Sequence, residues 1–228
     1  MRYSRLVVAF LALLLALSSA GPVFADTATL TFTGVGGANG GGEYTYPYYF
    51  NISGGPQPGD NQSLICDSFD NSINAPQTWT ANVYSLLTAG TPGNGYFSNL
   101  PGAQTLYDAA GIIFEQILTG AVSAVQGNWA IWGLFSANAS SNPFYTTSGA
   151  NLTEAAALSA AEYDVAHGTL PSYLANMVVY TPEGGVAGGT GAQEFIGLTP
   201  EPATLAMFGS GLGLLAAAIR RRRHLPSN

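Results

Sequence analysis

Hydrophobic and polar positions alternate over much of the first half of the chain, a pattern typical of half-buried β-strands. The segment 27–33 alternates Thr with Ala, Leu and Phe, and the segment 77–86 places Trp79, Ala81 and Val83 on one side. Two shorter apolar segments near the C-terminal end predict closing strands. Strands are predicted at residues 27–33, 44–52, 62–69, 77–86, 176–180 and 193–196.

A glycine-rich segment, residues 34–42, follows the first predicted strand. A glycine loop after a strand can cradle a phosphate when a Lys follows and a helix opens directly after it. Neither feature is present here. The segment is therefore predicted to be a flexible connector.

The periodicity changes in the middle of the chain, where apolar residues recur every three or four positions. This spacing predicts helices that bury one stripe. The first helix ends at Gly120, and the second ends near Phe135. The third covers 152–167, with Asn151 as its predicted cap and Gly168 after its end. The stripes are Leu106, Ala109, Ala110, Ile113, Phe114 and Ile117 for the first helix, and Val122, Val125, Trp129 and Trp132 for the second.

Strands followed by helices and then by strands indicate an α+β fold. We expect a single β-rich domain with an inserted helical segment, spanning residues 26–198. This length suits one domain. An N-terminal signal peptide and a C-terminal transmembrane helix are expected to flank it.

The N-terminal end has the layout of a secretory signal. Arg2 and Arg5 precede a twelve-residue apolar run, and small residues follow it. Residues 1–25 are therefore predicted to be a signal peptide, cut by signal peptidase between Ala25 and Asp26. A retained anchor is the alternative, but the run is short for a membrane span.

A second apolar run, residues 203–219, lies near the C-terminal end. Its seventeen residues contain no charge and would extend about 25 Å as a helix, near the lower limit for crossing a bilayer. A cluster of arginines follows and should stay cytoplasmic, which places the preceding domain outside. An amphipathic or core helix is the alternative, but every face of the run is apolar or small. The arginines are Arg220, Arg221, Arg222 and Arg223.

Charge separates the two ends from the domain between them. Only 8% of residues are charged, against roughly 25% in an ordinary globular domain. All six Lys and Arg lie at the ends, whereas all but one of the 13 Asp and Glu lie between Asp26 and Thr199. Because phosphate binding depends on Lys and Arg, the domain is a poor candidate for nucleic acid, nucleotides or anionic lipid.

The C-terminal segment resembles a known sorting signal. Pro200, Glu201 and Pro202 precede the apolar run and the arginine cluster, an order similar to the PEP-CTERM signal of bacterial exported proteins. The resemblance covers residues 199–224. It implies that the tail holds the precursor in the inner membrane until an exosortase-type membrane transpeptidase cuts near the Pro-Glu-Pro motif. The body then goes to the cell surface or to an extracellular matrix, such as that of a biofilm.

Cys66 is the one cysteine in the chain, so the exported domain has no internal disulfide. A lone cysteine on a strand is most simply a small buried hydrophobe. Its surroundings suggest a second interpretation, because several short motifs follow it in order across residues 62–137. These are Ile65-Cys66-Asp67, Trp79-Thr80-Ala81, Tyr107-Asp108-Ala109-Ala110 and Trp129-Ala130-Ile131-Trp132.

This ordered set resembles a domain found in many PEP-CTERM proteins and the thioester domains of Gram-positive surface adhesins. In the adhesins a Cys thiol and a Gln side chain condense to an internal thioester that captures amines. Here Asn128 stands four residues before Trp132, where the adhesin pattern has Gln. The nearby Gln126 falls about 200° around the helix from that position. The candidate residues are therefore Cys66, Gln126 and Asn128, and a shared scaffold without the bond is favoured.

Two other chemistries rest on few residues. A cysteine hydrolase would need a base, and His167 is the one histidine before the tail. His167 lies in the last turn of a predicted helix, where the helix dipole favours an imidazole and no catalytic role is needed to explain it. Oxygen-bearing Asp60, Asp67 and Asp70 could hold Ca²⁺, but their spacing does not match an EF-hand loop. We expect no catalytic residue, metal or cofactor.

The sequence therefore predicts a non-enzymatic exported protein with an adhesive or structural role. Its processing partners would be signal peptidase and exosortase, and an exopolysaccharide or another surface component could be its ligand. A covalent module using Cys66 is the alternative, and a hydrolase the second alternative.

Overall fold

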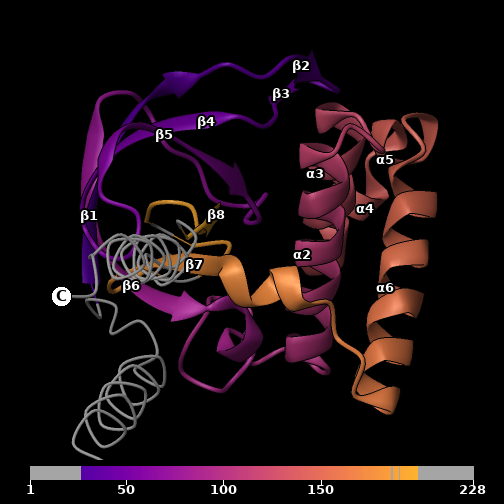
Figure 1. The fold of residues 1–228 in the computed structure, drawn as a ribbon. Coiled ribbons are helices and arrows are strands. Elements are labelled where there is room, and N and C mark those ends of the chain that lie inside the picture. Colours follow the sequence, from indigo (N-terminus) through magenta and orange to yellow (C-terminus); the bar gives the residue numbers. More distant parts are fainter. Residues whose placement is uncertain (1–26, 186, 190, 200–228) are drawn as a thin grey trace, which may run out of the picture. The chain divides into compact units, whose positions relative to one another are not determined.

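The computed structural model describes residues 27–185, 187–189 and 191–199. Within them, antiparallel strands close into a barrel, drawn in Figure 1 with the strand order β1-β4-β5-β8-β7-β6. β6 and β7 are neighbours in the barrel although a long helical segment separates them in the sequence. The barrel strands are β1 (Thr27–Val35), β4 (Tyr48–Gly54), β5 (Gly59–Cys66), β6 (Gln77–Ser85), β7 (Met177–Pro182) and β8 (Phe195–Leu198).

Alternation along the strands fills the barrel with aromatic rings. In β1, Leu30 and Phe32 are buried, while the threonines between them face outward. Phe195 of β8 stacks edge-on against Phe50 of β4, with ring centroids 4.7 Å apart, and also contacts Trp79 of β6. The burial of these large rings is a major source of the stability of the fold.

The helices are inserted between β6 and β7 and form layers beside the barrel (Figure 1). α2 and α3 lie beside the barrel, and α6 packs outside them. The short segments η1 (Leu86–Thr88) and η2 (Ser172–Asn176) connect the insertion to the barrel. The helices are α2 (Ala103–Leu118), α3 (Ala124–Phe135), α4 (Ala137–Ser141), α5 (Pro143–Thr147) and α6 (Ala150–His167).

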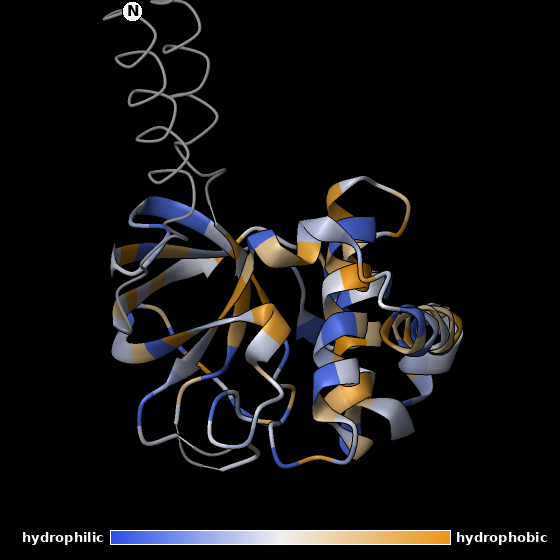
Figure 2. Ribbon diagram, turned by 60° about the horizontal axis from the view of Figure 1, so that its bottom comes forward, coloured by the Kyte–Doolittle hydropathy of each residue, from blue (hydrophilic) through white to orange (hydrophobic). Residues whose placement is uncertain are grey.

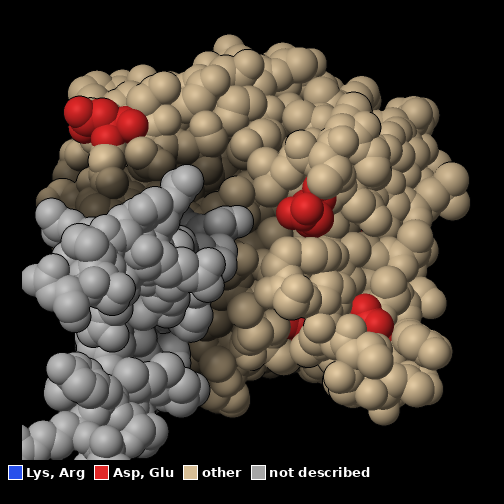
Figure 3. Space-filling view, viewed as in Figure 1, with Lys and Arg blue, Asp and Glu red and all other residues tan. Residues whose placement is uncertain are grey.

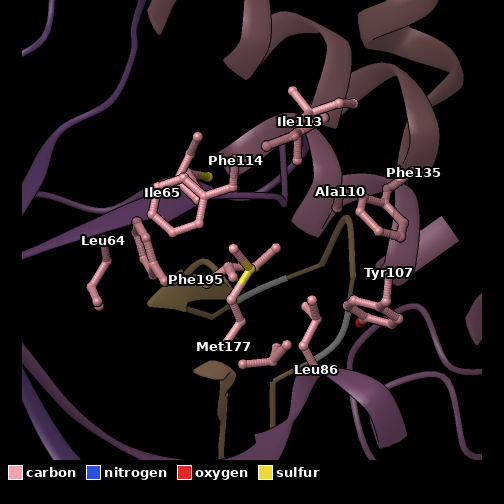
Figure 4. Packing of buried hydrophobic residues seen from close by; sticks show 14 of the residues in the cluster. Leu64, Ile65, Leu86, Tyr107, Ala110, Ile113, Phe114, Phe135, Met177 and Phe195 are labelled. Atoms are coloured by element: carbon pink, nitrogen blue, oxygen red, sulfur yellow. The ribbon is translucent and has the colours of Figure 1, made fainter. Parts of the chain in front are cut away.

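One core joins the barrel to the helices. Figure 4 shows α2 residues such as Ile113 and Phe114 facing Met177 and Phe195 of the barrel. Gly111 brings α2 close to this layer, because an added Cβ would lie 2.4 Å from a methyl group of Leu86. Figure 2 shows the same division into a barrel and a group of helices, with hydrophobic stretches in both. The predicted β-rich α+β domain with an inserted helical segment is therefore confirmed in outline.

The glycine-rich segment differs from its prediction. It forms a hairpin of β2 (Asn39–Gly40) and β3 (Glu43–Tyr44) that packs against the helices instead of acting as a flexible connector. The indole N–H of Trp129 donates to the carbonyl of Gly40 at 2.9 Å. A Cβ on Gly41 would lie 2.7 Å from the rings of Trp129 and Phe144. Glycine is needed here because two aromatic rings lie against the backbone.

Several predicted boundaries also move. The strand around Cys66 ends at that residue, because the following backbone turns toward β8. Gly149, in the left-handed conformation, caps α6, so Asn151 lies inside its first turn. α4 and α5 were not predicted, since helices of five residues carry too few apolar positions to show a period.

The predicted signal peptide 1–25, the predicted transmembrane run 203–219 and the sorting segment from Pro200 onward lie outside the described residues. No helix among residues 27–199 that are described is long and apolar enough to cross a membrane. Figure 3 shows isolated acidic groups on one face of the domain, in keeping with a sequence that has no Lys or Arg there.

Candidate functional site around Cys66

Cys66 lies at the end of β5 and is fully buried. Its side chain shares the barrel interior with Phe195, its partner across the ladder. Burial raises the pKa of the thiol to about 12, and the neighbouring Asp67 adds to the increase, while Trp132 and Ser68 lower it slightly. The thiol donates a weak hydrogen bond to the carbonyl of Ser68 at 3.6 Å. A buried neutral thiol is a poor nucleophile.

Asn128 of α3 is placed beside Cys66, as the resemblance implied, but its amide bonds to the backbone. Its Nδ2 donates to the carbonyl of Cys66 at 2.8 Å. Its Oδ1 accepts from the backbone N–H of Tyr46, also at 2.8 Å. Asn128 is fully buried, and it joins β5 to the segment before β4 by pairing the carbonyl of the buried Cys66 and the N–H of the partly buried Tyr46.

Gln126 points to a different part of the molecule. Its Nε2 donates to the hydroxyl of Thr153 at 2.9 Å and more weakly to the carbonyl of Gly149. Both acceptors belong to the start of α6. The structure therefore brings Asn128 to Cys66 and holds Gln126 against the outer helix.

A pair of buried acids lies next to the thiol. Asp67 and Glu194 are both fully buried, and their backbones meet where Asp67 N–H donates to the carbonyl of Glu194 at 3.4 Å. Burial raises the pKa of each carboxyl, and for Asp67 the charge of Glu194 adds to the increase. Because the domain has no Lys or Arg, no cation neutralises the pair.

The two carboxyl groups differ in their hydrogen bonds. Glu194 accepts from Tyr107 O–H at 2.6 Å, from Tyr96 N–H at 2.8 Å and from the hydroxyl of Thr181. Among the described residues, no N–H or O–H group donates to either carboxyl oxygen of Asp67, whose carboxyl interacts with that of Glu194. The donors around Glu194 favour its carboxylate form, whereas burial and the charge of Glu194 raise the pKa of Asp67 and favour its protonated form.

This acid pair joins four parts of the fold. Asp67 follows β5, Glu194 precedes β8, Thr181 is in β7, and Tyr107 is in α2. Ser68 adds another link, because its hydroxyl accepts from the backbone N–H of Glu194 at 2.7 Å. The arrangement therefore ties the backbone next to Cys66 to β7, β8 and α2.

The sequence did not point to Glu194 or Tyr107 as members of this site. Glu194 is the acid that directly precedes the buried segment 195–197, in a domain that offers no cation. The sequence did contain a signal for this site, namely an acid next to an apolar strand in a domain without a cation to pair with it. Its partner Tyr107 was quoted only as part of a motif, since its distance from Glu194 in the sequence conceals their contact.

The residues considered for other chemistry lie apart. His167 is exposed at the end of α6, where its ring stacks on Tyr163, whereas Cys66 is fully buried. Asp70 accepts from the amide of Asn138, and Asp60 is exposed. In the part of the chain that the structure describes, no group of three or more His, Cys, Asp or Glu is placed to hold a metal ion.

The domain is weakly similar to one solved structure, the N-terminal thioester domain of a protein F2 like fibronectin-binding protein from Streptococcus pneumoniae. The alignment covers 80% of this chain and 98% of that chain, with 12% identity and a TM-score of 0.38. No curated protein matches the sequence.

The C-terminal end matches a family model. Residues 198–223 fit the PEP-CTERM protein-sorting motif, which confirms the resemblance seen in Pro200, Glu201, Pro202 and the arginine cluster. The motif implies processing by an exosortase-type membrane transpeptidase. The chain is therefore an exported protein whose membrane-anchored precursor carries a PEP-CTERM sorting signal.

Proposed function

We propose that this chain is a non-enzymatic protein of the cell surface or extracellular matrix, with an adhesive or structural role after its tail is removed. The sorting motif at 198–223 carries this proposal, because it concerns delivery to the surface. The domain contributes a compact barrel with a helical layer and a surface whose charges are acidic. An uncharged-to-acidic surface favours polar ligands such as exopolysaccharide over nucleic acid.

The polar groups around Cys66 support a role without chemistry at the thiol. Asn128 is committed to Tyr46 and to the carbonyl of Cys66, and Gln126 is committed to Thr153. Glu194 already accepts from several donors. A catalytic group needs an accessible reacting atom, and a thiol with a pKa near 12 inside the barrel offers none.

The intact mass of the protein recovered from its native host tests this proposal. We expect the mass of a chain that has lost the signal peptide and the tail, with one thiol that titrates after denaturation. Full-length protein in the cytoplasm would contradict export. A mass about 17 Da below the sequence mass, restored by an added amine, would instead establish the covalent alternative, in which Cys66 carries a thioester.

A further inference from the structure

The last strand of the barrel continues directly into the sorting motif. β8 ends at Leu198, which lies opposite Met177 of β7. The matched motif spans residues 198–223 and so begins inside this strand. Leu198 and Thr199 therefore belong both to the folded domain and to the segment that matches the sorting motif.

Thr199 is attached to the domain by two hydrogen bonds to one carbonyl. Its backbone N–H donates to the carbonyl of Asn176 at 2.7 Å, and its hydroxyl donates to the same oxygen at 3.2 Å. Leu198 is partly buried and packs against the core. Pro200 is the next residue, so no spacer separates the barrel from the Pro-Glu-Pro motif.

Only a short segment lies between the barrel and the apolar run, so an enzyme that cuts there has little chain to bind. Three residues lead from Thr199 to Pro202 and reach at most about 11 Å when extended. The apolar run that is expected to enter the membrane starts at the following residue. An enzyme that cuts in this interval must hold residues on both sides of the peptide bond, which brings Leu198 and Thr199 into its cleft.

The barrel can release these two residues and remain closed. β5 pairs with β8 only at Phe195 and Ile196, so the contacts that close the barrel lie before Leu198. Among the residues that the structure describes, Leu198 and Thr199 are bonded to β7 and to Asn176. Strand ends with few partners open locally at a low free-energy cost.

We propose that the folded barrel and the transpeptidase compete for Leu198 and Thr199, so that the tail is cut from molecules in which these residues have detached from Met177 and Asn176. This inference rests on the sorting function proposed above. In the reaction one amide bond of the motif breaks, the acyl carbon passes to water or an acceptor amine, and the released amine takes a proton. Detachment of the strand end then limits the rate of tail removal.

An insertion separates the two roles of this segment. Placing Gly-Ser-Gly-Ser-Leu-Thr between Thr199 and Pro200 leaves the original Leu198 and Thr199 in the barrel and gives the enzyme an unpaired copy. Pulse-chase labelling in the native host, read as a shift in size, measures tail removal. We expect removal about tenfold faster, since each hydrogen bond that no longer has to open contributes roughly a factor of 2 to 12. The same insertion between Pro92 and Gly93, in an exposed turn, is the matched control and should leave the rate unchanged.

Thr199→Ala distinguishes competition from a simple need for a longer reach. In the natural chain it removes one bond to Asn176 and should accelerate tail removal, whereas beside the insertion it should have no effect. Equal rates for the natural chain and the insertion, or acceleration by the insertion alone, overturn the competition. If the tail stays on every variant, the sorting function itself fails together with this inference. Unchanged melting temperatures confirm that the variants fold.

Discussion

The buried pair of Asp67 and Glu194 should make the protein less stable as the pH rises. An unfolded carboxyl releases its proton near pH 4, whereas the folded pair retains one proton because the pKa of both groups is raised by burial. The folded state therefore binds more protons than the unfolded state above pH 4. Its stability is fully present below that pH and is lost progressively until the raised pKa is reached.

The magnitude follows from the single retained proton. One proton of difference between the two states changes the free energy of unfolding by about 1.4 kcal/mol per pH unit. Over the pH range in which the folded pair keeps its proton, the protein should lose this amount with each pH unit, an appreciable part of the 5–15 kcal/mol typical of a domain. Asp108 and Glu154, whose pKa values are also raised by burial, change stability in the same direction.

Asp67→Asn removes the carboxyl that retains the proton in the folded state. The amide N–H can donate to Glu194 at every pH, so the slope should decrease by about 1.4 kcal/mol per pH unit relative to the natural chain. Asp60→Asn, at an exposed carboxyl, is the matched control and should keep the full slope. Urea unfolding at pH 5.5, 6.5 and 7.5, followed by tryptophan fluorescence, measures each free energy.

Two results would refute this reasoning. Stability of the natural chain that is constant or rises over this pH range would show that the pair does not retain a proton. An Asp67→Asn variant with the slope of the natural chain would show that the retained proton lies elsewhere, for example on Asp108 or Glu154.

Three further predictions concern the thiol of Cys66, the side chain of Asn128 and the glycine hairpin. The thiol should be unreactive toward a thiol reagent in the folded protein at pH 8, because it is buried and its pKa is near 12. In denaturant it should react with one equivalent of the reagent. Rapid reaction in the folded protein would contradict its burial. Asn128→Ala should reduce the free energy of unfolding by about 2–5 kcal/mol, since two backbone groups lose their partner, while Asn138→Ala, at an exposed site, should cost far less in the same urea titration. Gly41→Ala should lower the free energy of unfolding by about 1–3 kcal/mol more than Gly42→Ala, because both glycines have positive φ but only Gly41 faces aromatic rings. Equal melting temperatures of the two variants would argue against a packed hairpin.

The sequence alone predicted the elements with a clear period and the signals with a fixed order. The stripe of α2 and the alternation in β1 and β6 are local patterns, so they were visible without the fold. The sorting motif was visible because its three parts lie next to one another along the chain. The absence of Lys and Arg between Asp26 and Thr199 is likewise evident from the sequence without the fold.

Tertiary structure decided how distant segments meet. Barrel closure depends on β8 lying between β5 and β7, a pairing that no local pattern encodes. It also decided the environment of Cys66, where Asn128 bonds to backbone and Asp67 lies buried beside Glu194. Such contacts join residues far apart in sequence, and their energy depends on burial, which arises only when the chain has folded.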